Sequence, residues 1–232
     1  MEPAVERAPC ILSRLHRAYP NANCALFHRD PWQLLVATIL SAQCTDKRVN
    51  MVTPELFARY PTPAALAAAE QEELEGIIRS TGFYHAKARH LRASANIITD
   101  EHSGRVPDTM EALLKLPGVA RKTANVVLGT SYGIAVGVVV DTHVFRISRR
   151  LGFSVGNSPS IVERDLMRVV PQDEWIMYSH LLIHHGRAIC MARKPTCKEC
   201  MLADLCPSAF FSEGRTKDLH TALKRAPSKG KD

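Results

Sequence analysis

The segment that most constrains the fold is 116–129, in which a Pro-Gly-Val-Ala turn separates two helical patterns. Upstream, residues 108–111 have the spacing of a capping box and are followed by an apolar stripe, so a short helix is expected to stop at Pro117. Downstream, small and apolar residues continue without a breaker to Gly129, which predicts a second helix. Its first backbone N–H groups lie beside Arg121 and suit a phosphate group. An ordinary helical hairpin, in which Pro and Gly only reverse the chain, remains the alternative.

Helical periodicity continues over most of the 232 residues and predicts an all-α protein of about ten helices. The first helix is expected from Ile11 to Tyr19, after a proline-containing lead-in. Thr45-Asp46 is expected to cap a helix that Thr53-Pro54 interrupts, because proline lacks the backbone N–H. The valine-rich run 136–140 is strand-like, but it is too short and too isolated to imply a sheet.

The charge balance favours a polyanionic partner. Thirty Lys and Arg residues against twenty-three Asp and Glu residues give a net charge of +7, which fits nucleic acid or, as the alternative, an anionic membrane surface. No apolar stretch approaches the roughly 20 residues that span a bilayer. The first residues lack the basic and apolar regions of a secretion signal, so a reducing, cytosolic compartment is expected.

Four of the seven cysteines stand close together as C-x6-C-x2-C-x5-C. In a reducing compartment this spacing indicates a metal site instead of disulfides. Thiolates select zinc or an iron–sulfur cluster, and the ligand type alone does not separate the two; unmetallated thiols are the third alternative. The four residues are Cys190, Cys197, Cys200 and Cys206. The remaining cysteines have no such spacing and are interpreted as core or incidental thiols.

Residues 116–128 resemble the helix-hairpin-helix of the endonuclease III family of DNA repair glycosylases, and the resemblance extends from about Pro31 to Cys206. It implies a six-helix domain, 24–133, with the helix-hairpin-helix at about 109–130. It also implies a second helical domain, 1–23 plus 134–210, and a DNA-binding cleft between the two. The cysteine spacing matches the family's [4Fe–4S] loop at every interval. Residues 211–232, polar and basic, are expected to form a flexible tail.

The resemblance also implies two catalytic residues. The family's nucleophilic lysine falls on Lys122, and its aspartate falls on Asp141 in a Val-Asp-Thr-His segment. On their own, Lys122 would be interpreted as a phosphate-contacting or solvated lysine and Asp141 as an ordinary helix N-cap. Attack of the neutral Lys122 amine on a flipped, damaged nucleotide would form a Schiff base, and β-elimination would then nick the strand.

Further residues are expected to contact DNA. Gln43 matches the family's wedge glutamine, and Phe83 stands where the family often has leucine; a helix-ending amide and a core-filling ring are their structural alternatives. The sequence departs from the family at Ala120, usually a second hairpin glycine, so the turn is expected to be slightly reshaped or to rely on Gly118 alone. The other expected contacts are Arg121 in the hairpin and Arg193 and Lys194 in the cysteine loop.

The leading hypothesis is therefore a bifunctional base excision repair enzyme that removes oxidised pyrimidines from duplex DNA and cleaves abasic sites. We expect a monomer in a bacterial-type cytoplasm, associated with the nucleoid through DNA, with no membrane partner. A monofunctional adenine glycosylase lacks the lysine at the position of Lys122 and carries an extra C-terminal domain. A non-catalytic, iron–sulfur DNA-structure-binding protein would need neither Lys122 nor Asp141.

Overall fold

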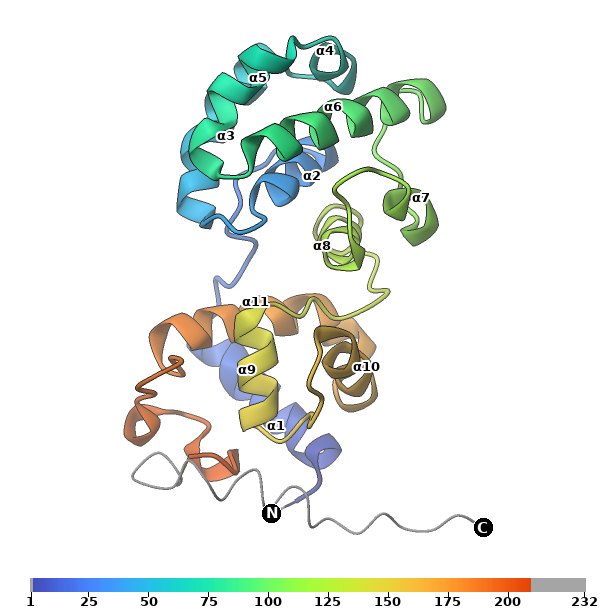
Figure 1. The fold of residues 1–232 in the computed structure, drawn as a ribbon. Helices are drawn as coiled ribbons and strands as arrows, with labels where there is room; N and C mark the ends of the chain where they lie inside the picture. Colours follow the sequence, from blue (N-terminus) through green and yellow to red (C-terminus); the bar gives the residue numbers. More distant parts are fainter. Residues whose placement is uncertain (1, 210–232) are drawn as a thin grey trace. The chain divides into compact units, whose positions relative to one another are not determined.

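The structure is a computed structural model that describes residues 2–209; the expected basic tail, 211–232, lies outside this range. Within it the chain forms eleven α-helices and four 3-10 helices, and no strand occurs in the described part (Figure 1). The prediction of an all-α protein is confirmed. The valine-rich run 136–140 forms no strand, as its isolation indicated.

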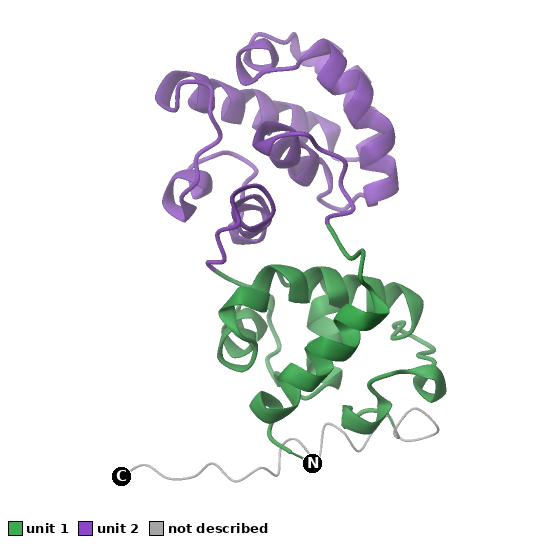
Figure 2. Ribbon diagram, turned by 180° about the vertical axis from the view of Figure 1, so that it is seen from behind, with its two compact units in different colours: residues 1–23, 137–232 green, residues 24–136 purple. Residues whose placement is uncertain are grey.

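The chain divides into two compact units (Figure 2). Unit 1 comprises Met1–Asn23 and the chain from Gly137 onward, and unit 2 is Cys24–Val136. The helices of unit 2 are α2 (Pro31–Leu40), α3 (Asp46–Arg59), α4 (Pro63–Ala67), α5 (Gln71–Ile78), η1 (Arg79–Thr81), α6 (Tyr84–Glu101), α7 (Met110–Leu114) and α8 (Arg121–Tyr132). Those of the described part of unit 1 are α1 (Ala4–Ala18), α9 (Thr142–Arg150), α10 (Pro159–Val169), η2 (Gln172–Glu174), α11 (Trp175–Ala188), η3 (Cys197–Glu199) and η4 (Ala203–Leu205).

Helix α2 forms the centre of unit 2. Its sequence is apolar almost all round, and its residues from Leu34 to Leu40 are all buried. It contacts α3, α6 and α8, as expected of a helix with no polar face. Asp30 begins it by accepting a hydrogen bond from Gln33 N at 2.8 Å.

In unit 1, α11 contacts α1 and α9, and α10 contacts the same two helices. Tyr178 of α11 is fully buried, and its hydroxyl group lies 2.9 Å from Ser148 Oγ of α9. Burial raises the pKa of Tyr178, so the phenol stays neutral and the hydrogen bond joins two helices of the core.

Two expectations about proline were wrong. Helix α1 begins at Ala4 and includes Pro9, and α3 runs through Pro54 without a break. Both prolines are exposed, whereas neighbours such as Ala8 and Thr53 are buried. Each proline therefore removes one hydrogen bond on the solvent side, while burial of the opposite face holds the helix together.

The start of α7 also differs from the expected capping box at 108–111. The N-cap is Thr109, one residue later, and its Oγ1 accepts from Ala112 N at 3.3 Å. Asp108 and Thr109 are both good N-cap residues, and their local spacing does not choose between them.

Across the described chain, no helix has the length and apolar character that crossing a membrane would require.

Candidate functional site

The turn between α7 and α8 is anchored on α6. Leu116 and Val119 are buried on either side of it. The carbonyl oxygen of Pro117 accepts a hydrogen bond at 2.8 Å from Ser94 Oγ, which lies on α6 and is almost completely buried. Burial of Leu116 and Val119 and the hydrogen bond from Ser94 to Pro117 O together hold this four-residue turn against α6.

Gly118 is required at the tip of this turn for two reasons. Its φ is +81°, a conformation that residues with a Cβ rarely adopt. A Cβ built at this position would also lie 3.0 Å from His90 Cβ on α6. Backbone conformation and packing therefore both select glycine.

Ala120 causes no strain, although the family usually has glycine there. Its φ of −96° and ψ of 170° are ordinary extended values, so the turn relies on Gly118 alone. Ala120 occupies the N-cap position of α8 but has no side-chain acceptor, and no side-chain hydrogen bond caps this helix. The N-terminal end of α8 is therefore suited to accept an anion from outside.

Arg121 and Lys122 lie in the first turn of α8, and both side chains are exposed. Asp141 belongs to the other unit, where it is the N-cap of α9. Its Oδ1 accepts from Val144 N at 2.8 Å. This bond fixes the carboxylate at the start of the helix while leaving its second oxygen available, since a carboxylate has several acceptor positions.

Gln43 and Phe83 both lie in unit 2, on loops that follow α2 and η1. Their φ values are +52° and +50°, and both side chains are exposed. Phe83 is 66% exposed, so the core-filling alternative for its ring is wrong. Such conformations cost on the order of 1–3 kcal/mol each and persist where the surrounding structure enforces them.

Lys87, which no sequence signal indicated as a site residue, lies on α6 close to both loops. Its side chain is only 4% exposed, and its Nζ donates to Leu40 O at 2.7 Å and to Thr81 O at 2.9 Å. A lysine between Ala86 and Ala88 gives no sequence signal of burial beyond its place on the apolar side of the helical pattern.

The four clustered cysteines lie around η3 and η4 as half-buried free thiols. Several groups donate to them: Arg150 Nη1 lies 3.2 Å from Cys190 Sγ, and Leu202 N lies 3.4 Å from Cys200 Sγ. Burial, with smaller contributions from the other three cysteines, raises the pKa of Cys206 to about 11. Among residues 2–209, however, no three His, Cys, Asp or Glu side chains converge in an arrangement that could hold a metal ion.

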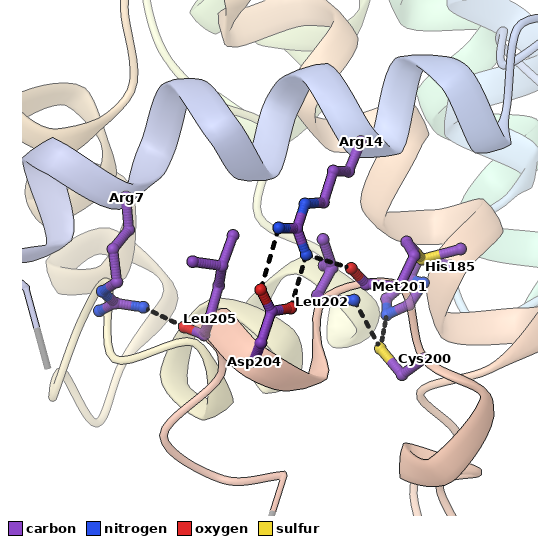
Figure 3. A network of polar contacts seen from close by, with 8 residues as sticks. All are labelled: Arg7, Arg14, His185, Cys200, Met201, Leu202, Asp204 and Leu205. Atoms are coloured by element: carbon purple, nitrogen blue, oxygen red, sulfur yellow. Dashed lines mark hydrogen bonds and ion pairs between the residues drawn. The ribbon is translucent and has the colours of Figure 1, made fainter.

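Two arginines of α1 hold the segment 201–205, which lies between the third and fourth clustered cysteines (Figure 3). Arg14 forms a bidentate ion pair with Asp204 and donates to Met201 O at 2.8 Å. Arg7 is buried and donates to Leu205 O at 2.6 Å. The loop between the first two cysteines carries Arg193 and Lys194, both exposed.

These features define an all-helical protein with a rigid hairpin that presents an uncapped, basic helix end. Residues 36–172 match the HhH-GPD superfamily of base excision DNA repair proteins. The sequence is 56% identical over 207 residues to Endonuclease III of Synechocystis sp., covering 89% of this chain and 94% of that protein. Endonuclease III of Escherichia coli K12 is 42% identical over 196 residues, covering 84% and 92%.

A solved structure of a trapped endonuclease III–DNA covalent intermediate has the same fold, with a TM-score of 0.84 and 43% sequence identity. The match covers 90% of this chain and 98% of that one. The chain therefore belongs to the HhH-GPD superfamily of base excision DNA repair proteins. The curated relatives named above are endonuclease III proteins, in agreement with the resemblance that the hairpin sequence carries.

The hairpin yields a matched pair of substitutions. Gly118→Ala is expected to lower the free energy of unfolding by on the order of 1–3 kcal/mol. The positive φ of this position is unfavourable for alanine, and the new Cβ would lie too close to His90. Ala120→Gly, two residues away, should change it by less than about 1 kcal/mol, since an extended φ needs no glycine. Chemical denaturation of the two variants tests this, and equal losses would contradict the account of the turn.

Proposed function

We propose that this DNA N-glycosylase and abasic-site lyase of base excision repair removes oxidised pyrimidines from duplex DNA through a Schiff base on Lys122. The observation that carries the proposal is the position of Lys122. It is an exposed amine in the first turn of α8, directly after a hairpin whose helix end has no side-chain cap. The family relationship supports the same assignment.

The hairpin would bind the DNA backbone next to the reacting nucleotide. Backbone N–H groups at the start of α8 and the guanidinium of Arg121 are suited to a phosphate group. Gly118 lets the backbone approach closely, because no side chain projects from the tip. Lys122, one residue after Arg121, would then face the sugar instead of being a second phosphate contact.

The chemistry needs a neutral amine. An ordinary lysine is neutral in only about one molecule in 10³ at pH 7. The Lys122 nitrogen would attack the anomeric carbon of a flipped nucleotide, the bond from that carbon to the base would break, and the base would leave with the bonding electrons. Opening of the sugar gives an imine, and loss of a proton from C2′ expels the 3′ phosphate and nicks the strand.

Asp141 would stabilise the positive charge that develops on the sugar in this reaction. Its carboxylate is oriented by the hydrogen bond from Val144 N, so little reorganisation is needed when positive charge develops on the sugar. The same group can assist the proton transfers. We assign no role in catalysis to the histidines His143, His184 and His185.

Gln43 and Phe83 would fill the space that the flipped base leaves. Both side chains project from loops of one unit, and both are exposed. An aromatic ring stacks on neighbouring bases, and an amide can pair with the base left opposite. The enzyme would act as a monomer in a bacterial cytoplasm on duplexes with damaged bases or abasic sites.

Cys190, Cys197, Cys200 and Cys206 would hold a [4Fe–4S] cluster. The donor set fits, because four soft thiols lie in one loop region, and N–H donors from Arg150 and Leu202 can offset the charge of thiolates. When bound, the cluster would cross-link this region and fix the loop with Arg193 and Lys194 for contact with the DNA backbone.

Metal analysis tests the cluster assignment. Protein purified without oxygen is expected to contain about four iron atoms per chain and to be yellow-brown, as an iron–sulfur protein is. Cys206→Ser should lose most of this iron, whereas Cys10→Ser, which changes an exposed thiol of α1, should retain it. Stoichiometric zinc in the parent protein would overturn the assignment.

Single-turnover kinetics tests the roles of Lys122 and Asp141. Lys122→Ala is expected to abolish the borohydride-trapped adduct while damaged DNA still binds, because Arg121 and the hairpin amides remain. Lys115→Ala removes a similar charge near the hairpin and should still trap. Asp141→Asn keeps an oxygen that caps α9 but loses its charge, so the rate should fall by on the order of 10²–10³ with some slow trapping left.

These outcomes also separate the rival functions. A non-catalytic iron–sulfur DNA-binding protein would give no adduct even with the parent chain. A monofunctional adenine glycosylase would release a base without leaving an imine. If Lys122→Ala still forms the adduct, the nucleophile lies elsewhere; if Asp141→Asn is fully active, Asp141 is only a helix cap.

A further inference from the structure

Lys87 is an unusual residue for the interior of this protein. It is on α6 and only 4% exposed, and its ammonium group donates to two backbone carbonyl oxygens, Leu40 O and Thr81 O. Lysine is rarely buried to this extent unless its charge has partners. The two acceptors lie 47 and 6 residues away in the sequence, so the contact joins separate segments.

Both acceptors lie beside the proposed wedge residues. Leu40 is the last residue of α2, three residues before Gln43, and Thr81 is the last residue of η1, two residues before Phe83. The carbonyl groups at the end of a helix lack partners within it, and a cation is favourable there. One ammonium group thus joins the segments from which both loops start.

The two loops need such a restraint. Gln43 and Phe83 are two of only three non-glycine residues with positive φ in the described part of the chain. This conformation persists only where other contacts enforce it. A charged donor forms a stronger hydrogen bond to a carbonyl oxygen than a neutral donor does. Lys87 Nζ donates two such bonds.

Keeping a charge at this position is itself costly. Burial lowers the pKa of Lys87, which means that the protein environment disfavours the ammonium form relative to water. An apolar side chain would fill the same space without that cost. The retained charge therefore indicates a role that filling space does not explain.

We propose that Lys87 is a positioning residue that holds the loops of Gln43 and Phe83 together, so that both side chains enter the duplex as one rigid wedge. Lys87 is buried and does not itself touch DNA. The inference rests on the proposed wedge role of Gln43 and Phe83. It adds that the wedge action of Gln43 and Phe83 depends on the ammonium group of a third residue, Lys87.

The first test is Lys87→Met, which keeps most of the length of the side chain and removes its charge and donors. Single-turnover base release from a lesion in duplex DNA is expected to fall by about tenfold to a hundredfold, the range that corresponds to losing a hydrogen bond to a charged group. Cleavage of a preformed abasic site in a single-stranded oligonucleotide should change by less than about twofold, because no base has to be extruded. Lys87→Arg, which keeps a charged donor, should recover much of the loss.

A matched control separates positioning from general destabilisation. Ile98 is fully buried near the other end of α6, and Ile98→Ala lowers the stability of the same unit by leaving a cavity. At equal thermal destabilisation, Ile98→Ala should affect the duplex and single-stranded substrates alike. If Lys87→Met does the same, Lys87 only stabilises the fold and the inference is wrong.

A double-mutant cycle provides the decisive comparison. Phe83→Ala should slow duplex base release in the parent protein but have little further effect in Lys87→Met, because the wedge is already disordered. Additive losses would overturn the inference. If Phe83→Ala and Gln43→Ala are both without effect in the parent, the wedge role fails instead. Should Lys87→Met not fold, Lys87→Gln, which is shorter and has only a neutral donor, takes its place, with a smaller loss on the duplex expected and still no loss on the single-stranded substrate.

Discussion

The packing of the hairpin turn against α6 is the interaction on which the rest of the site depends. Ser94 binds the carbonyl group of Pro117, and His90 fills the space that Gly118 leaves without a Cβ. These contacts fix where α8 begins, and therefore where Lys122 and the helix amides lie within unit 2. Without them a four-residue turn with a left-handed glycine would have several accessible conformations, and conformational entropy would oppose any single one.

Helix α6 also carries Lys87, so one helix contacts both the hairpin and the loops of the proposed wedge. Lys87, His90 and Ser94 are three and four residues apart, which places them on one face. At about 1.5 Å per residue, the seven residues from Lys87 to Ser94 span roughly 10 Å along the helix axis. The rigidity of a regular helix thus links the proposed wedge to the proposed phosphate site.

Local signals in the sequence predicted the all-helical class and several helix starts, but not the starts of α1 and α7. Thr45 and Asp141 accept the N-cap hydrogen bond predicted for them. Asp30, Thr62 and Ser158 accept the same bond at their helices, and this bond depends only on residues three apart. Pro54 was misjudged because burial of the opposite helix face outweighed one missing hydrogen bond. Lys87 and the positive φ values of Gln43 and Phe83 could not be predicted, since they result from contacts between segments distant in sequence.

The assignment of the nucleophile is the central claim, and mapping of the covalent adduct tests it most directly. A duplex with an oxidised pyrimidine is reacted with the protein in the presence of borohydride, the adduct is digested, and tandem mass spectrometry locates the modified residue. The account predicts a reduced sugar remnant on Lys122 and on no other amine. An adduct on Lys115, on another lysine or on the amino terminus would contradict it.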